Sequence, residues 1–183
     1  MAKKKGPWLV AGTKVVYQNP WIKVREDKVI RPDGKKGIFG VVSMIPGVSV
    51  LPMDDKGNVY LTKEYHYGVE RVTIEAISGG IDKGETKLQA AKRELKEEAG
   101  LVAKKWTCLG VVDPFTTAVV SPNHIYLAQK LTQSKDEQEG TETIKVIKVP
   151  FERAVDWVMT SKVTHSATAT LILKAKNCKL LRT

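Results

Sequence analysis

Residues 79–101 read GGIDKGETKLQAAKRELKEEAGL, a glycine-containing segment followed by a helical pattern. Thr86, with Gln89 three residues later, fits a capping box, in which each side chain bonds the backbone N–H of the other residue. The apolar residues of the stretch recur at helical spacing: Leu88, Ala91 and Leu95. Gly100 stands where a glycine commonly ends a helix. The stretch therefore predicts a helix that begins after Thr86 and ends at Gly100, with one apolar face for packing.

Three carboxylates crowd another face of this predicted helix. Glu94, Glu97 and Glu98 are spaced i, i+3 and i+4, so they project from the same side. Three anions so close repel one another, and a hard cation reverses that effect because Mg²⁺ and Mn²⁺ prefer carboxylate oxygen. The spacing predicts a metal-binding face, and the alternative for these three residues alone is a solvated, glutamate-rich surface.

The residues before the helix add to the metal hypothesis. Gly79, Gly80 and Gly84 predict a loop immediately before the helix, where backbone carbonyls can approach a metal ion or a phosphate closely. Glu85 lies eight residues before Arg93. We expect these two side chains to pair and to hold the loop in place.

Every specified position of a 23-residue family motif is present in this stretch. The motif is G-x5-E-x7-R-E-U-x-E-E-x-G-U, with U a bulky aliphatic residue, and the matching residues are Gly79, Glu85, Arg93-Glu94-Leu95, Glu97-Glu98 and Gly100-Leu101. On these residues the chain resembles a Nudix hydrolase. Members of that family hydrolyse a nucleoside diphosphate linked to another group and use one to three divalent ions.

The resemblance implies a metal site on the helix. It makes Glu94, Glu97 and Glu98 the ligands of Mg²⁺, with Mn²⁺ as the alternative, and Glu98 the one nearest the attacking water. It adds the backbone carbonyl of Ser78 as a further ligand and gives Glu85 and Arg93 structural roles in the catalytic motif. Cations are suited to this reaction because they neutralise a pyrophosphate and lower the pKa of bound water.

Two neighbouring segments resemble one branch of the family, the ADP-ribose and nucleoside-diphosphate-sugar pyrophosphatases. They are KEYHYGVER at 63–71 and IEAISGGID at 74–82. The branch usually has an arginine where His66 stands and a Pro-Ala pair where Ile77-Ser78 stand, so the details of phosphate contact differ in this chain.

We expect four residues of these segments to bind the substrate phosphates: His66, Arg71, Gly79 and Gly80. The alternative for His66 and Arg71 is a structural role at the end of a strand.

Residues 1–45 have the length and the β-rich pattern of the N-terminal domain that this branch carries. In the branch, that domain helps to form a homodimer and places aromatic rings around the nucleobase. Trp21 and Phe39 fall where such rings are expected, and the alternative is that both belong to the core of a small β domain. Residues 46–183 are then the Nudix catalytic domain.

The order of apolar patterns predicts an α+β fold. Strand candidates include 48–51, 59–62, 72–77 and 124–131, and helical patterns at 151–160 and about 165–177 follow them. We expect a mixed sheet between helices, which is the α/β/α sandwich of the resembled family, preceded by the small N-terminal β domain.

A general base is expected in the acidic segment after residue 131. Glu142 occupies the position that the resembled branch uses for a catalytic glutamate, and Glu139 is the second candidate. The alternative for both is a solvated acidic loop.

Composition bounds the compartment and the partners. The 183 residues carry a formal charge of +10 with 42% hydrophobic residues, which is ordinary globular composition with a field that attracts anions. Cys108 and Cys178 form no CxxC pair, and no apolar run approaches the length of a membrane span. We expect a cytoplasmic protein with no membrane partner, whose surface charge also permits nucleic-acid binding without favouring it.

Three functions remain open at this point. The leading hypothesis is hydrolysis of a nucleoside diphosphate sugar, such as ADP-ribose or GDP-mannose, to a nucleoside monophosphate and a sugar phosphate. The second is hydrolysis of a nucleoside triphosphate or of an RNA cap. The third is a Nudix-fold nucleotide or nucleic-acid binder without turnover, which has no need of three clustered carboxylates.

Overall fold

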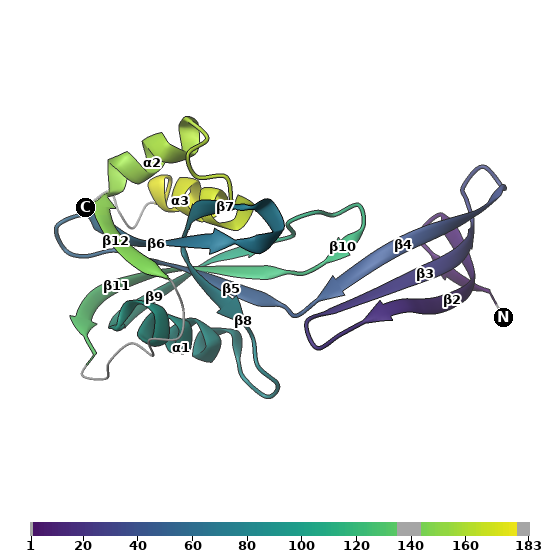
Figure 1. Ribbon diagram of the computed structural model, residues 1–183, viewed down its shortest axis with the longest axis horizontal. Helices are drawn as coiled ribbons and strands as arrows, with labels where there is room; N and C mark the ends of the chain where they lie inside the picture. The colour runs from purple at the N-terminus through teal and green to yellow at the C-terminus, as the bar shows by residue number, and fades with distance from the viewer. Residues whose placement is uncertain (1, 135–143, 179–183) are drawn as a thin grey trace. The chain divides into compact units, whose positions relative to one another are not determined.

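The computed structural model describes residues 2–134 and 144–178 (Figure 1). The chain forms two compact units. The first unit comprises Met1–Ile45 together with Asp113–Ser121, and the second comprises Pro46–Val112 and Pro122–Thr183.

The first unit is a five-stranded sheet in the order β1-β2-β3-β4-β10. Its strands are β1 (Lys3–Lys5), β2 (Trp8–Gln18), β3 (Ile22–Ile30), β4 (Lys36–Met44) and β10 (Val119–Val120). Strands β1 to β4 pair antiparallel in chain order, whereas β10 pairs parallel to β4. Residues 113–121 were predicted to belong to the domain of 46–183, but backbone bonds such as Val42 N–H to Ala118 O (2.8 Å) join them to the first unit.

One face of this sheet is partly covered by its own side chains. Trp8 and Phe39 meet edge to face with 5.4 Å between ring centroids. Asp27 on the same face is 3% exposed. Its carboxylate accepts from Thr13 Oγ1 (2.6 Å) and pairs with Arg25 Nε (3.3 Å). The hydrogen bond from Thr13, with the charge of Arg25, lowers the pKa of Asp27 although burial opposes this.

The second unit contains two sheets. A mixed sheet has the order β8-β5-β11-β9, in which β5 and β11 are parallel and the outer pairs are antiparallel. An antiparallel sheet has the order β12-β6-β7. The strands are β5 (Gly47–Pro52), β6 (Asn58–His66), β7 (Arg71–Glu75), β8 (Ile77–Gly80), β9 (Leu101–Val112), β11 (Asn123–Gln133) and β12 (Lys145–Pro150), with a short 3₁₀ turn at Tyr67–Val69.

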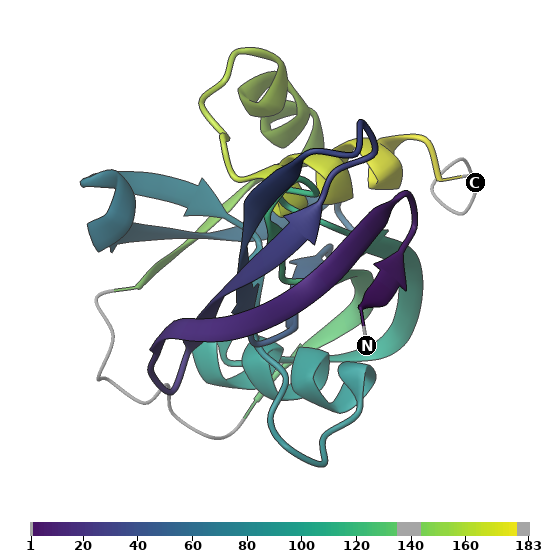
Figure 2. The same ribbon diagram turned by 90° about the vertical axis from the view of Figure 1, so that its right-hand side faces the viewer.

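Helices cover both sides of these sheets. Helix α1 (Lys87–Ala99) packs on β8, β5 and β9, while α2 (Phe151–Met159) and α3 (Ser166–Lys176) lie on the opposite side in both views (Figure 1, Figure 2). Two apolar clusters fill the layers. One lies between α1 and the mixed sheet and includes Val50, Ile77 and Leu95. The other includes Leu61, Ile125 and Leu171 of α3. The predicted α+β sandwich is confirmed.

The structure corrects the expected strand at 72–77. The chain forms two strands there, because β7 pairs with β6 and β8 pairs with β5 in a different sheet. Gly79 and Gly80 lie in β8, where they pair with Val48 and Gly47, and are not part of the loop before α1. Glycine was interpreted as a turn signal, but a strand also uses glycine where another group approaches closely.

No helix of residues 2–134 and 144–178 is long and apolar enough to cross a membrane. Cys108 and Cys178 are both free thiols.

Candidate metal centre and active site

Helix α1 begins and ends at the capping residues predicted from the sequence. Gln89 N–H donates to Thr86 Oγ1 (3.3 Å) and Thr86 N–H donates to Gln89 Oε1 (2.8 Å), which confirms the capping box. Gly100 adopts a left-handed conformation with φ 61° and ends the helix. The buried side chains Ala90, Ala91 and Leu95 fix the rotation of the helix about its axis, and with it the direction of the acidic face.

The three carboxylates of this face differ in exposure. Glu94 is 8% exposed, whereas the Glu97 side chain is 50% exposed and Glu98 is partly buried. Glu94 lies directly against β8, because a Cβ added to Gly79 would stand 2.0 Å from Glu94 Oε1. Gly79 is therefore the residue that lets the carboxylate approach the strand.

Arg93 connects the loop before α1 to the acidic face. Its guanidinium donates from Nε to Glu85 Oε1 and from Nη2 to Glu85 Oε2, each at 3.1 Å, which confirms the expected pairing. Nη2 also donates to Gly80 O (2.9 Å). Nη1 donates to Glu94 Oε1 (2.7 Å) and to Glu97 Oε2 (3.0 Å). One cation thus holds the loop, the strand and two of the three carboxylates.

These bonds shift the titration of both partners. Hydrogen bonds from Arg93 lower the pKa of Glu85 although its burial opposes this, and the bond to Glu85 is the largest cause that raises the pKa of Arg93.

The Glu85–Arg93 pair is expected to make stability depend on pH in the acid range. The folded Glu85 carboxyl has a pKa below its ordinary 4.5, so the stabilisation is complete above that value. It is lost as the pH falls from there through the folded pKa. Urea unfolding of wild type and Glu85→Gln from pH 7 to pH 3, with a chelator present, is expected to show a difference that shrinks at the acid end. A difference that stays constant over this range contradicts the pairing as a source of stability.

The residues of this face fit a hard divalent cation. In the described part of the chain, no three side chains from His, Cys, Asp and Glu are already grouped as a metal site, and Arg93 supplies the positive charge between Glu94 and Glu97. The candidate ligands Glu94, Glu97 and Glu98 are all carboxylates, which Mg²⁺ and Mn²⁺ prefer. Because residue 79 is glycine, the Glu94 carboxylate can lie against β8.

Ser78 lies on β8 one residue before Gly79. Its hydroxyl donates to Ala76 O (2.8 Å) and lies 2.9 Å from Ser49 Oγ on the neighbouring strand. The side chain is thus engaged within the fold, and the group of Ser78 predicted to bind the metal is its backbone carbonyl.

His66 and Arg71 belong to a second group of polar residues at the β6–β7 hairpin. His66 Nε2 lies 3.2 Å from Glu75 Oε1, and the partner of Arg71 is Thr164, with 3.2 Å between Arg71 Nη2 and Thr164 Oγ1. Arg71 is exposed and His66 half-buried. The structure brings Gly79, Gly80, Glu85, Arg93, Glu94 and Glu97 into one contact group and places His66 and Arg71 in another.

The two expected base-contacting rings lie in the first unit. Trp21 is 68% exposed just before β3, in a turn whose backbone N–H groups at Trp21 and Ile22 donate to the Asn19 side chain. Phe39 is half-buried and packs on Trp8. Sequence reasoning missed the hollow of about 160 Å³ beside that pair, lined also by Arg25 and Asp27. Residues that alternate between the two faces of β3 could have indicated that Arg25 and Asp27 lie on one face. Only the strand pairing shows that Trp8 and Phe39 share that face.

The two candidate general bases, Glu139 and Glu142, lie outside the described residues.

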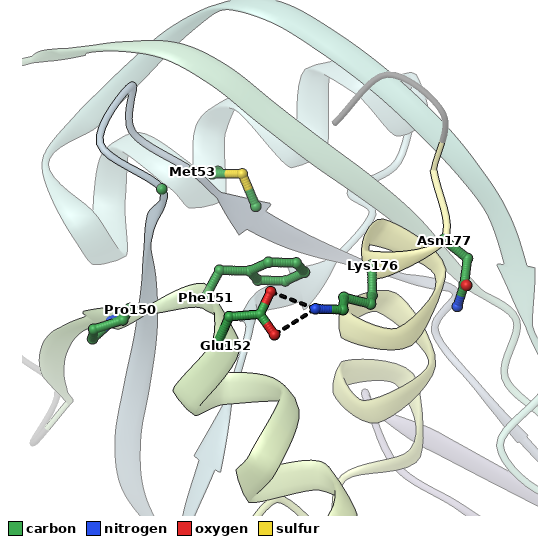
Figure 3. Close-up of a pocket in the computed structure, with 7 residues that line it drawn as sticks. Met53, Pro150, Phe151, Glu152, Lys176 and Asn177 are labelled. Carbon is green, nitrogen blue, oxygen red and sulfur yellow. Dashed lines mark hydrogen bonds and ion pairs between the residues drawn. The ribbon is translucent and has the colours of Figure 1, made fainter. Parts of the chain in front are cut away.

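Two further hollows belong to the second unit. One of about 580 Å³ lies at the start of α1 and is lined by residues that include Glu85, Lys87 and His124. Burial, with the nearby charge of Lys87, lowers the pKa of His124. The other, of about 610 Å³, is lined by Met53, Pro150 and Phe151 and by the Glu152–Lys176 ion pair between α2 and α3 (Figure 3). It contains none of the expected site residues.

Comparison with known proteins agrees with this geometry. Residues 5–42 match the nucleoside diphosphate sugar hydrolase N-terminal domain, and residues 44–168 match the NUDIX domain. An ADP-ribose pyrophosphatase of Bacillus subtilis is 30% identical over 162 residues, covering 84% of each chain. ADP compounds hydrolase NudE of Escherichia coli is 31% identical over 109 residues, covering 60% of this chain and 58% of that one.

The fold has a solved counterpart in the crystal structure of an ADP compounds hydrolase. The two align with a TM-score of 0.82 at 22% identity, over 96% of each chain. The complete motif at 79–101, the match over residues 44–168 and the Bacillus relative, aligned over 84% of each chain, give one result: the chain belongs to the Nudix hydrolase family.

Proposed function

We propose that this chain hydrolyses the pyrophosphate bond of nucleoside diphosphate sugars, with ADP-ribose as the first substrate and GDP-mannose as the next. The products are a nucleoside monophosphate and a sugar phosphate. The observation that carries the proposal is the acidic face of α1, with Glu94 seated on Gly79, in a chain that matches an ADP-ribose pyrophosphatase over 84% of its length.

The metal in this proposal is Mg²⁺, or Mn²⁺, in one to three ions. Glu94, Glu97, Glu98 and the Ser78 carbonyl would hold it, and all are oxygen donors. When bound, the metal supplies charge neutralisation for the diphosphate and activates water. Glu85 and Arg93 keep the loop and Gly80 in place, and Arg93 balances the charge of the carboxylates.

Six residues are proposed to contact the substrate. The backbone at Gly79 and Gly80 and the side chains of His66 and Arg71 bind the phosphates, and Trp21 and Phe39 stack on the nucleobase. The charge of the N-terminal segment supports an anionic substrate. Residues 1–45 contain ten Lys and Arg against three Asp and Glu, a net charge of +7.

Three more assignments complete the proposal. Glu142 is the general base, with Glu139 as the alternative. Residues 1–45 form the domain through which two copies make a homodimer, and exposed apolar residues on that segment, such as Trp21 at 68% and Ile38 at 68%, support this. The protein acts in the cytoplasm.

A phosphate-release panel tests the substrate. ADP-ribose, GDP-mannose, UDP-glucose, a nucleoside triphosphate and a capped RNA are incubated with the protein and a phosphatase, with Mg²⁺ or with a chelator. We expect phosphate release from the diphosphate sugars only with the metal, and release from ADP-ribose fastest of all. Cleavage of the triphosphate or the cap alone would move the activity to a different Nudix reaction. Metal-independent binding of nucleic acid without any turnover would support the binding-module hypothesis instead.

A further inference from the structure

The break between β7 and β8 is held by a side chain from the C-terminal helix. Ala76 is the residue at which the chain leaves the β6–β7 sheet for the β5–β8 pair. Its backbone N–H donates to Thr168 Oγ1 on α3 at 2.9 Å, across 92 residues of sequence. Ala76 is 1% exposed, so water does not replace this acceptor.

Thr168 is itself fixed by a partly buried polar network. It is fully buried in the first turn of α3, and its Oγ1 lies 2.9 Å from His165 Nδ1. His165 Nδ1 is also 3.1 Å from Glu75 Oε2. The other oxygen of Glu75 accepts from Thr73 Oγ1 (2.6 Å) and faces His66. Burial lowers the pKa of His165 although Glu75 opposes this, which disfavours a charged ring beside Thr168.

The anchored residue lies just before the metal-site strand. The Ala76 carbonyl accepts from Ser78 Oγ (2.8 Å), so side chains hold both polar groups of the Ala76 backbone. Gly79, which the Glu94 carboxylate approaches closely, follows Ser78 directly. Three planar peptide units join Ala76 to Gly79, so a change in the position of Ala76 reaches the Ser78 carbonyl over a short stretch of chain.

We propose that Thr168 is a positioning residue for the metal site, setting the Ser78–Gly79 segment of β8 against the acidic face of α1. The proposal rests on the function proposed above, because it takes the Ser78 carbonyl and the α1 carboxylates as the metal ligands. It gives the C-terminal helix, which lies outside the Nudix motif, a role in metal affinity.

The test replaces Thr168 with valine, which keeps the shape and removes the acceptor. Binding of Mn²⁺ alone is measured by electron paramagnetic resonance of the free ion. The Mn²⁺ dissociation constant of T168V is expected to rise by about tenfold or more, as is typical when a residue that orients a metal ligand is lost. Thr168→Ser restores the hydroxyl and is expected to bind within about twofold of wild type.

Thr170→Val is the matched control. Thr170 lies on the same helix, half-buried, and among the described residues its side chain makes no hydrogen bond. T170V is expected to bind Mn²⁺ as wild type does, and T168V binding as tightly as T170V overturns the role of Thr168. Absence of Mn²⁺ binding by wild type overturns the metal site itself, and the role of Thr168 toward it, so the two failures are distinguishable.

A measurement on the wild-type chain covers the case in which T168V does not fold. Amide hydrogen exchange is followed by nuclear magnetic resonance without metal. The Ala76 amide is expected to be protected like the buried strand amide of Val50. Exchange of Ala76 at the rate of an exposed loop amide overturns the anchor.

Discussion

Replacing Glu98 with glutamine is expected to lower kcat for ADP-ribose by about 10³-fold or more while the protein stays folded. The reason is the charge that the substitution removes. Glu98 projects from the acidic face of α1 beside Glu94, and the proposed reaction needs ionised oxygen at this point to hold the metal nearest the attacking water. The neutral amide keeps the size of the side chain and loses most of its affinity for a hard cation.

Steady-state kinetics at saturating Mg²⁺ measures this effect, and thermal unfolding in a chelator checks the fold of E98Q. Glu26→Gln in β3 is the matched control, since it makes the same chemical change at a residue that is neither a proposed metal ligand nor a proposed substrate contact. E98Q with near-normal kcat would remove the metal mechanism on α1. A fall of the same size in E26Q would show that the assay reports net charge and not the site.

Adding one methyl group at Gly79 is expected to disable the site by geometry alone. The new Cβ would lie 2.0 Å from Oε1 and 2.5 Å from Oε2 of Glu94, both far inside van der Waals contact. Either Glu94 leaves β8 or the strand moves, and each displaces the carboxylate from its partners. We expect Gly79→Ala to lower kcat by about 100-fold and the free energy of unfolding by about 1–3 kcal/mol.

Kinetics and urea unfolding measure the two effects of Gly79→Ala. Gly68→Ala is the control, because a Cβ there meets nothing within 4 Å and the backbone is not left-handed. Gly68→Ala should match wild type in both measurements. Normal activity in Gly79→Ala would mean that the close approach of Glu94 to β8 is not needed for catalysis.

The sequence predicted α1 in detail because its signals are local. A capping box, apolar residues at helical spacing and a terminal glycine all act within a few residues of each other, so tertiary packing had little to change. The Glu85–Arg93 pair was predictable for a related reason. The residues between them are the N-cap and the first turns of α1, so the predicted helix itself sets how far Arg93 lies from Glu85.

The strands around the site were harder to predict. The run from Val72 to Ile77 is rich in β-branched residues, and this pattern does not reveal that Ala76 separates strands of two different sheets. Gly79 was recognised as a site residue, but the reason for glycine at that position appears only when Glu94 is seated against it.

The sequence by itself determined the acidic helix, the motif and the family to which they belong, because side-chain type and spacing along one helix carry that information. The tertiary structure decided which groups lie beside that helix. It brought Thr168 to Ala76 across 92 residues, joined Asp113–Ser121 to the first unit and placed Trp8 on Phe39. Strand pairing and the burial of helix faces fix such contacts, and these depend on the whole chain.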